Sequence, residues 1–276
     1  MAISQEDFRF VSGYLYRESG IALTDEKAYL VENRLGELCR SIGLSSISAL
    51  VQELRARPGG EVKQQMVEAM TTNETSFFRD VTPFEALRMA ILPELLELRK
   101  NTRSLRIWSA AASTGQEAYT TAMLLDMNFS RVIKDWKIEI LGTDLAEKVL
   151  ERSRSGEYSQ LEVNRGLPAQ YLVAYFKKKA SRWQINEQIR KLVRFQQMNL
   201  LEVPASLPPF DIIFCRNVLI YFDDATKRKV LSALHSKLQT DGYLILGASE
   251  VLNNAADLFE RVHRGGTVVY RKVRKA

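Results

Sequence analysis

The sequence predicts an α/β fold with a mostly parallel sheet, preceded by a small all-helical domain. Strand patterns alternate with amphipathic helical patterns between residues 105 and 246, which is typical of parallel sheets. A strand at 105–108 ends in small residues at 110–115 that open a helix, and α/β folds build nucleotide sites at such turns. A second strand, 138–144, ends in an acid, Asp144.

Residues 1–70 show only helical periodicity, and we expect four short helices there. Ser4 is positioned to cap the first helix, and Ser45 or Ser46 the third. Pro and Gly at 57–60 predict a firm stop after the third helix. This segment carries no evident catalytic group of its own.

Residues 71–100 are interpreted as a linker and a connecting helix. The stretch 71–80 is too polar for a core helix, yet Phe77 and Phe78 require burial, so we expect it to dock against the protein. Pro83 suits the first turn of the helix that follows, and Pro93 predicts a kink in it.

Residues 101–276 are interpreted as the catalytic domain. Its central turn lacks both the G-x-G-x-x-G and the G-x-x-x-x-G-K-[ST] spacing, which argues against a bound pyrophosphate. Glu117 instead brings a carboxylate to the start of the helix, and this suits a positively charged ligand. An ordinary tight strand–helix turn is the alternative.

Asp144 stands where nucleotide-binding α/β proteins take up ribose hydroxyls, although an Asp that only caps the next helix is also common. The alternation breaks between about 154 and 191, where we expect an inserted subdomain. Trp183, Ile185 and Ile189 indicate small strands within it.

Strands are expected again at 192–195, 210–215 and 243–246, with a helix carrying Val230 and Leu234 before the last of these. The segments 258–264 and 267–270 flank Gly265-Gly266, and together they predict a closing antiparallel hairpin.

Composition narrows the class of protein. With 46% hydrophobic and 26% charged residues, the 276-residue chain resembles a soluble globular protein. Cys39 and Cys215 are far apart and only two His are present, so we expect no metal site and a reducing, cytoplasmic setting. No apolar run approaches the roughly 20 residues that span a bilayer, and no signal peptide is evident, so no membrane insertion is expected.

The net charge of +6 is unevenly distributed. Residues 1–70 contain 8 basic and 10 acidic residues, whereas residues 151–200 contain 10 basic and 4 acidic ones. A basic patch around 177–194 attracts acidic partners, either nucleic acid or an acidic protein surface. A solvated charged face is the alternative.

Five motifs together resemble the chemotaxis receptor methyltransferases, the CheR family. They are, in chain order, TTNETSFFR (71–79), WSAAASTGQE (108–117), GTD (142–144), NLL (199–201) and FCRNVLIYF (214–222). The resemblance is collinear over nearly the whole chain. It implies a class I S-adenosylmethionine-dependent methyltransferase with a Rossmann-like sheet, an N-terminal helical domain and a small inserted β-subdomain. The implied reaction is O-methylation of glutamate side chains on chemoreceptor cytoplasmic helices, which yields S-adenosylhomocysteine.

Carried over by motif, the resemblance also implies site residues. Arg79 suits the methionine carboxylate, Glu117 the cationic end, and Asp144 the ribose. The full cofactor set is Asn73, Thr75, Arg79, Ala111, Gly115, Glu117, Asp144, Asn199, Leu200, Cys215, Arg216 and Asn217.

Asn199 and Leu200 correspond to contacts with adenine, and Cys215 to Asn217 to the floor beneath the sulfonium. Tyr221 resembles the family's tyrosine beside the transferred methyl, and we hypothesise that Tyr221 and Arg216 orient the incoming carboxylate. Taken singly, these residues also read as core aromatics, a surface ion pair and a turn residue.

The chain departs from the family in two places. Its helical domain is net acidic, with Lys27, Arg34 and Arg40 as the best candidates for a basic receptor-facing surface. The loop at 177–183 has no glycine, whereas members that tether to a receptor's C-terminal pentapeptide have a longer, glycine-containing loop. We therefore predict action without that tether, by a monomer, on a chemoreceptor and not on nucleic acid. The alternatives are a methyltransferase for RNA or another acidic substrate, and a binding module without turnover.

Overall fold

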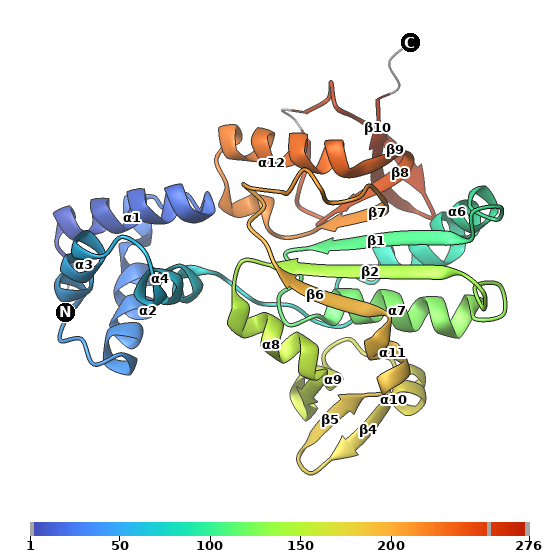
Figure 1. Cartoon of the computed structure of the whole chain (residues 1–276), viewed down its shortest axis with the longest axis horizontal. Coiled ribbons are helices and arrows are strands. Elements are labelled where there is room, and N and C mark those ends of the chain that lie inside the picture. Colours follow the sequence, from blue (N-terminus) through green and yellow to red (C-terminus); the bar gives the residue numbers. More distant parts are fainter. Residues whose placement is uncertain (1–2, 253–254, 274–276) are drawn as a thin grey trace. The chain divides into compact units, whose positions relative to one another are not determined.

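The structure is a computed structural model that describes residues 3–252 and 255–273 (Figure 1). Contacts divide the chain into two units. The first runs to Thr72 and includes Tyr221–Thr226, and the second contains Asn73–Ile220 and the chain from Lys227 onward.

The first unit is helical. Its elements are α1 (Gln5–Ser19), the 3₁₀ turn η1 (Asp25–Lys27), α2 (Ala28–Ser41), α3 (Ile47–Ala56) and α4 (Glu61–Met70). The predicted caps are present, because Ser4 accepts from the backbone N–H of Asp7 at 3.1 Å and Ser46 from that of Ala49 at 3.1 Å. Apolar side chains from all four α-helices are fully buried and form this unit's core: Val11, Leu15, Val31, Leu35, Leu50, Leu54 and Met66.

Arg34 does not belong to a free basic surface, contrary to the expectation from the sequence. Its Nη1 donates to the carbonyls of Met70 at 2.7 Å and Thr71 at 3.1 Å, and its Nη2 to the Thr72 hydroxyl at 2.9 Å. The last carbonyls of a helix have no partner within the helix, so a cation there is stabilised. Arg34 thus closes the end of α4.

The segment 221–226 is held by the first unit although it lies late in the sequence. The backbone N–H of Ala22 donates to the carbonyl of Tyr221 at 3.0 Å. The Tyr16 hydroxyl donates to the Asp223 carboxylate at 2.9 Å. Hydrophobic periodicity carries no trace of these pairings, which join residues some 200 positions apart.

The second unit is built on a seven-stranded sheet in the order β6-β2-β1-β7-β8-β10-β9 (Figure 1). β1, β2, β6, β7 and β8 are parallel, and β9 and β10 form the predicted antiparallel hairpin at one edge. The predicted α/β class is therefore confirmed. The strands are β1 (Ser104–Ala110), β2 (Lys137–Asp144), β6 (Val193–Gln197), β7 (Phe210–Cys215), β8 (Leu238–Leu246), β9 (Phe259–Arg264) and β10 (Thr267–Lys272).

Helices connect and cover these strands. They are α5 (Thr82–Ala86), the π-helical turn η2 (Leu87–Ile91), α6 (Leu92–Leu98), α7 (Gln116–Phe129), α8 (Glu147–Ser155), the 3₁₀ turn η3 (Leu219–Tyr221) and α12 (Asp224–Lys237). β1 and α7 lead to β2 on one side, whereas β7 lies on the other side of β1. Ligands of open α/β sheets bind at the carboxyl ends of the strands where the order reverses. Topology therefore points to the ends of β1 and β7.

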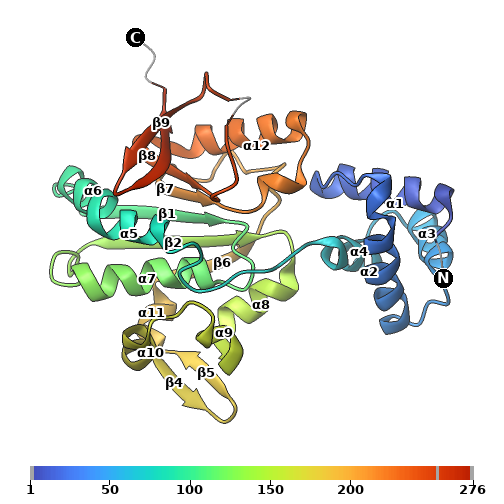
Figure 2. The same ribbon diagram turned by 180° about the vertical axis from the view of Figure 1, so that it is seen from behind.

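Both faces of the central strands are buried. Leu105 and Ile107 of β1 pack with Ala118 and Ala122 of α7 in one core, where α7 lies with α5 and α6 on one face of the sheet (Figure 2). Trp108 follows Ile107 in the strand and therefore points to the opposite face, because successive strand residues alternate. It is fully buried as well, so both faces are covered. Apolar residues on both faces of a strand predict burial on both faces, which is what Leu105, Ile107 and Trp108 indicate in the sequence.

The polar stretch 71–80 docks as predicted. Phe77 is fully buried, with its ring 4.9 Å from that of Tyr158 and 5.6 Å from that of Phe176. The connecting helix is interrupted by η2, directly before the segment that contains Pro93. Such π-helical turns are one recognised cause of a bend in a helix.

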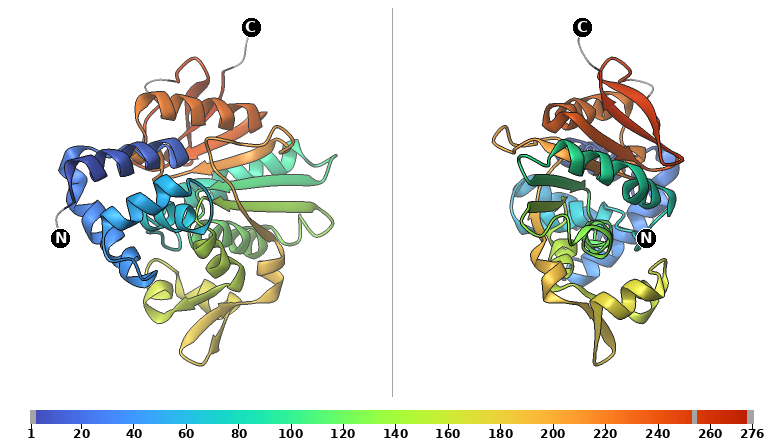
Figure 3. Two further views of the ribbon diagram at one scale, coloured as in Figure 1. Left: turned by 60° about the vertical axis from the view of Figure 1, so that its left-hand side comes forward. Right: turned by 90° about the vertical axis from the view of Figure 1, so that its right-hand side faces the viewer.

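The inserted subdomain contains α9 (Gln160–Asn164), α10 (Ala169–Tyr175), α11 (Glu187–Lys191) and a three-stranded sheet in the order β3-β5-β4. The strands are β3 (Glu157–Ser159), β4 (Phe176–Lys179) and β5 (Arg182–Ile185), and the β4–β5 hairpin projects away from the large sheet (Figure 3). Ile189 lies in α11 and not in a strand, so that expectation was wrong. Asn186 caps α11 by accepting from the N–H of Ile189 at 3.0 Å, a start signal that outweighs three alternating apolar residues.

Membrane-spanning helices were looked for throughout residues 3–252 and 255–273, and none has the required length and apolar character.

Candidate functional site

The turn after β1 has an unusual backbone. Ala111 and Ser113 adopt positive φ values of 61° and 51°, and Gly115 has φ of 90°. A Cβ at Gly115 would also lie 2.9 Å from the Phe195 ring and 3.1 Å from Ser153. Only glycine fits position 115, and the two non-glycine residues hold a conformation that costs free energy. Such strain concentrates at functional sites and depends on support from its surroundings.

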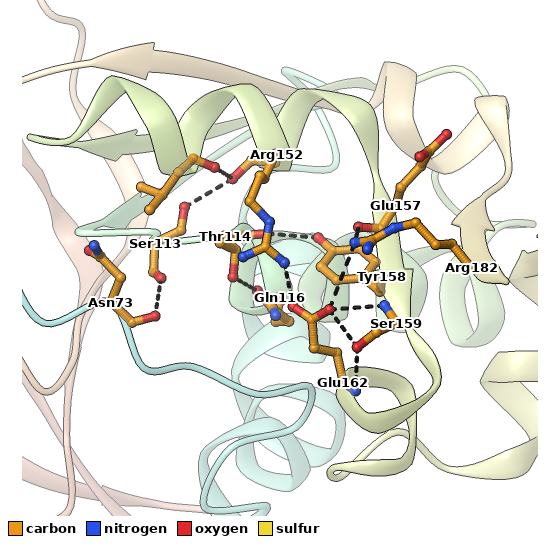
Figure 4. Close-up of polar contacts among 12 residues, drawn as sticks. Asn73, Ser113, Thr114, Gln116, Arg152, Glu157, Tyr158, Ser159, Glu162 and Arg182 are labelled. Atoms are coloured by element: carbon orange, nitrogen blue, oxygen red, sulfur yellow. Dashed lines mark hydrogen bonds and ion pairs between the residues drawn. The ribbon is translucent and has the colours of Figure 1, made fainter. Parts of the chain in front are cut away.

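Hydrogen bonds from three directions provide that support (Figure 4). The Ser113 hydroxyl donates to the carbonyl of Asn73 at 2.7 Å, and the Ser153 hydroxyl to the carbonyl of Ser113 at 2.9 Å. Tyr158 of β3 donates to the carbonyl of Thr114 at 2.8 Å. Burial raises the pKa of the Tyr158 phenol well above its usual range, so it stays a donor at neutral pH. The inserted subdomain thus braces the central turn.

Asp144 joins the ends of the two central strands. Its carboxylate accepts from the backbone N–H of Ser113 at 2.8 Å and from that of Ala146 at 3.0 Å, and the residue is 7% exposed. The turn N–H of Ser113 therefore already has an anionic partner, which agrees with a site that does not bind phosphate there.

Glu117 and Arg216 form a buried ion pair between the start of α7 and the residue after β7. Arg216 Nη1 lies 2.9 Å from Glu117 Oε2, and Glu117 Oε1 accepts from the Ser109 hydroxyl at 2.7 Å. Arg216 Nη2 donates to the Asp80 carboxylate at 2.8 Å and to the carbonyl of Arg79 at 2.7 Å. The Arg216 side chain is only 3% exposed, so these contacts replace its hydration.

Two buried polar atoms beside this pair have no partner among the described residues: Arg216 Nε and Asn217 Oδ1. The first is a donor and the second an acceptor. The amino-acid end of S-adenosylmethionine carries a carboxylate acceptor and an ammonium donor, so the chemistry of this floor fits that group.

Cys215, the last residue of β7, is fully buried. Burial is the main cause that raises the pKa of its thiol well above the usual range, and the charges of Glu250 and Glu117 add to it. The thiol is therefore neutral at physiological pH. Because the thiolate is the nucleophilic form, Cys215 can line a site but does not act as a nucleophile. Among residues 3–252 and 255–273, no group of three His, Cys, Asp or Glu side chains is arranged to hold a metal ion.

The remaining predicted residues are placed as follows. Arg79 is half-buried, and its Nη1 donates to the carbonyl of Glu74 at 2.7 Å. Asn199 follows β6 and accepts from the backbone N–H of Leu201 at 3.0 Å, as a turn residue does, while Leu200 is buried. Thr75 is half-buried in the docked stretch 71–80.

Hydrogen bonds thus join five predicted residues into two groups: Asn73 and Asp144 around Ser113, and Glu117, Arg79 and Arg216. Asn217 directly follows Arg216 in the chain. Tyr221 is half-buried and its contacts belong to the first unit.

Three polar residues of this region were not singled out in the sequence. Asp80 directly follows the first motif, and Ser109 lies inside the second, so both were within reach of motif reasoning. Glu250 lies beyond β8 and is more than 30 residues from the loop after β7 in the sequence, so that only folding brings the two into contact. No local pattern marks it.

Comparisons with known proteins agree with this geometry. The family description "CheR methyltransferase, SAM binding domain" matches residues 73–267, and "CheR methyltransferase, all-alpha domain" matches residues 6–71. The chain is 42% identical over 274 residues to chemotaxis protein methyltransferase 1 of Pseudomonas aeruginosa, covering 98% of this chain and 99% of that protein. It is 41% identical to chemotaxis protein methyltransferase Cher2 of Pseudomonas putida, with the same coverage, and 36% identical to that of Salmonella typhimurium, covering 97% and 91%.

Proposed function

The chain belongs to the CheR methyltransferase family, and from this premise we propose that it transfers a methyl group from S-adenosylmethionine to glutamate side chains of a chemoreceptor cytoplasmic domain. The products are a glutamyl methyl ester and S-adenosylhomocysteine. The observation that carries the proposal is the buried pair of Glu117 and Arg216, together with Asp144 at the end of the neighbouring strand, at the sheet edge where topology predicts a ligand.

Several residues are proposed to hold the cofactor. Asp144 would accept the ribose hydroxyls, and Asn199 and Leu200 would take the edge and face of the adenine. Arg216 Nε, Asn217 Oδ1 and the Arg79 guanidinium would receive the amino-acid end. Thr75, Ala111, Gly115 and Cys215 would line the space, and Glu117, paired with Arg216, would lie beside the cationic end.

When bound, S-adenosylmethionine supplies a methyl group on a cationic sulfur, which keeps the C–S electron pair as the methyl leaves. The substrate glutamate has a pKa of about 4.3 and is already ionised at neutral pH, so the site needs no general base. Its task is to align the carboxylate with the methyl group and to exclude water. Tyr221 and Arg216 are proposed to orient that carboxylate.

Arg216 is well suited to a fixed role, because three protein groups hold its terminal nitrogens. A side chain whose rotamer is locked by such contacts keeps a reacting group within the narrow tolerance that catalysis needs.

The proposed partner is a chemoreceptor, on which the protein acts without being tethered to the receptor's C-terminal pentapeptide. The β4–β5 hairpin is closed by only two residues, Ala180 and Ser181, which supports the prediction that no long peptide-binding loop is present. Three of the basic residues in the predicted patch are engaged by neighbouring acids, namely Lys179 with Glu157, Arg182 with Glu162 and Lys191 with Glu187. This pairing reduces the free positive charge, and we propose that nucleic acid is not the partner. A monomer in the cytoplasm is the proposed state.

The decisive experiment incubates the protein with S-adenosylmethionine labelled in the methyl group and a receptor cytoplasmic fragment. We expect base-labile label in the fragment, and less of it in fragments whose candidate glutamates are changed to glutamine. Label in added RNA, or binding of S-adenosylmethionine without transfer to any fragment, would contradict the proposal.

A further inference from the structure

Glu250 is a buried carboxylate outside the motifs discussed above. It lies four residues beyond the end of β8 and is 7% exposed. Its Oε2 accepts from the backbone N–H of Asn217 at 2.7 Å and of Gly247 at 2.8 Å. Its Oε1 accepts from the N–H of Val218 at 3.0 Å and of Leu219 at 2.8 Å. One side chain therefore binds three consecutive amides of the loop after β7.

Burying an ionised carboxylate is costly unless the protein replaces its hydration. Among the described residues, no lysine or arginine pairs with Glu250. Four backbone donors provide the compensation instead, and hydrogen bonds to a charged acceptor are stronger than neutral ones. The charge is thus used to hold the backbone of this loop.

The loop after β7, residues 216–219, has a backbone conformation that requires support from its surroundings. Asn217 has φ of 57°, in the left-handed region. This loop also carries the two buried atoms without a partner at the floor of the site, Arg216 Nε and Asn217 Oδ1. β7 and β8 are parallel neighbours, with Cys215 beside Leu246, so the two loops leave the same edge of the sheet.

Gly247 completes the contact from the β8 side. A Cβ at this position would lie 2.8 Å from Glu250 Oε2 and 2.9 Å from Asn217 Nδ2. Any side chain at 247 would therefore push the carboxylate and the loop apart. Glu250 and Gly247 form one device, which we call the loop grip.

We propose that Glu250 is a positioning residue for methyl transfer, which holds the loop 216–219 in its reactive arrangement through the loop grip. The inference rests on the proposed function of Arg216 in orienting the substrate carboxylate. The loop also carries Arg216 Nε and Asn217 Oδ1, which are proposed to receive the amino-acid end of the cofactor. The central turn and Asp144 form no part of the loop grip, so we expect methyl transfer to fall more than cofactor affinity.

The test is Glu250→Gln, with Glu260→Gln on the exposed face of β9 as the matched control. A glutamine has only one acceptor oxygen, so its amide nitrogen leaves two of the four N–H groups without a partner. Misplacing a reacting group by about 1 Å can cost on the order of 100-fold, so we expect kcat for receptor methylation to fall by about 30-fold or more. The Kd for S-adenosylmethionine, measured by calorimetry, should rise by a smaller factor than kcat falls, because Asp144 and the central turn keep their contacts.

Hydrogen exchange gives a second readout that a general loss of stability would not produce. The amides of residues 217–219 should exchange faster in Glu250→Gln, while those of β7 and β8 keep their protection. Gly247→Ala attacks the same contact from the other side and should show the same pattern, so the test does not depend on one variant folding.

Two outcomes would overturn the proposal: turnover by both variants within about threefold of the wild type, or parallel loss of kcat, cofactor affinity and protection across the sheet. If the wild-type protein binds S-adenosylmethionine but methylates no receptor fragment, the proposed function fails. Faster exchange confined to residues 217–219 would then still support the loop grip, and unchanged exchange would overturn it.

Discussion

Glu117 Oε2 lies 2.9 Å from Arg216 Nη1, in an ion pair whose two side chains are 11% and 3% exposed. The pair connects the first turn of α7 to the residue after β7 and so bridges the two strand ends between which the sheet order reverses. Its partners Ser109 and Asp80 complete the hydrogen bonding.

Removing Glu117 should destabilise the second unit. Glu117→Ala leaves Arg216 buried with Asp80 as its one remaining acid, and breaking a buried pair costs about 3 kcal/mol or more. Urea unfolding followed by tryptophan fluorescence measures this, with exposed Glu202→Ala as the control. Combining Glu117→Ala with Arg216→Met should cost less than the sum of the single changes. A loss below about 1 kcal/mol in Glu117→Ala would mean that solvent reaches the arginine readily.

Asp144→Asn should weaken cofactor binding. The carboxamide has one acceptor oxygen and cannot serve the Ser113 N–H and two ribose hydroxyls together. Hydrogen bonds to charged groups contribute about 1.5–3 kcal/mol, so we expect the Kd for S-adenosylmethionine to rise by about 10- to 100-fold. Calorimetry tests this against Asp135→Asn, an exposed position. Equal affinities of the two variants would remove Asp144 from the proposed site.

Tyr221→Phe and Arg216→Ala should lower methyl transfer more than cofactor binding, because both residues are proposed to orient the substrate carboxylate. We expect kcat to fall by about tenfold or more in Tyr221→Phe, with the Kd for S-adenosylmethionine little changed. The exposed Tyr29→Phe serves as the control. Calorimetry and transfer of labelled methyl measure the two quantities, and equal losses in both would count against the assignment.

Acidification should destabilise the protein through Asp241. The hydrogen bond from Arg99, whose Nη1 lies 2.8 Å from the Asp241 carboxylate, is the main cause that holds the pKa of that carboxyl below its usual value. A lowered folded-state pKa stabilises the protein above the unfolded value of about 3.9, and this contribution is lost as the pH falls through the folded value.

At about pH 6, Asp241→Asn should be less stable than the wild-type protein. When the pH is lowered to about 3, the free energy of unfolding should fall by more in the wild-type protein than in Asp241→Asn. Urea titrations at both pH values give the comparison, and Asp135→Asn should behave like the wild type. The same loss in Asp241→Asn as in the wild type would assign the acid sensitivity to other carboxylates.

A peptide with the sequence of a receptor's C-terminal pentapeptide should not bind tightly. The two-residue turn between β4 and β5 leaves little backbone for an added peptide to contact. Calorimetry with the intact protein should detect no binding in the nanomolar-to-micromolar range. Binding in that range would show that the short hairpin is sufficient for tethering.

Local patterns predicted much of the architecture. Leu105, Ile107 and Trp108 indicate a strand buried on both faces, and the glycine pair at 265–266 indicates a hairpin. The caps at Ser4 and Ser46 also follow from spacing within a few residues. Ile189 was misplaced because three alternating apolar residues do not distinguish a strand from the start of a short capped helix.

Of the residues that the motifs single out, hydrogen bonds join Asn73 and Asp144 through Ser113, and Glu117 and Arg79 through Arg216. The motifs did not indicate these pairings. Glu117 was expected to face a cationic ligand, and the structure shows that Arg216 already neutralises it.

The fold class, the central turn and the kinds of side chain at the site could therefore be predicted from short-range periodicity and residue type. The contacts of Glu250 with residues 217–219, and those of Tyr16 and Ala22 with the segment 221–226, could not. These contacts join residues about 30 and 200 positions apart. Only chain folding brings such residues into hydrogen-bond range, and no local propensity records it.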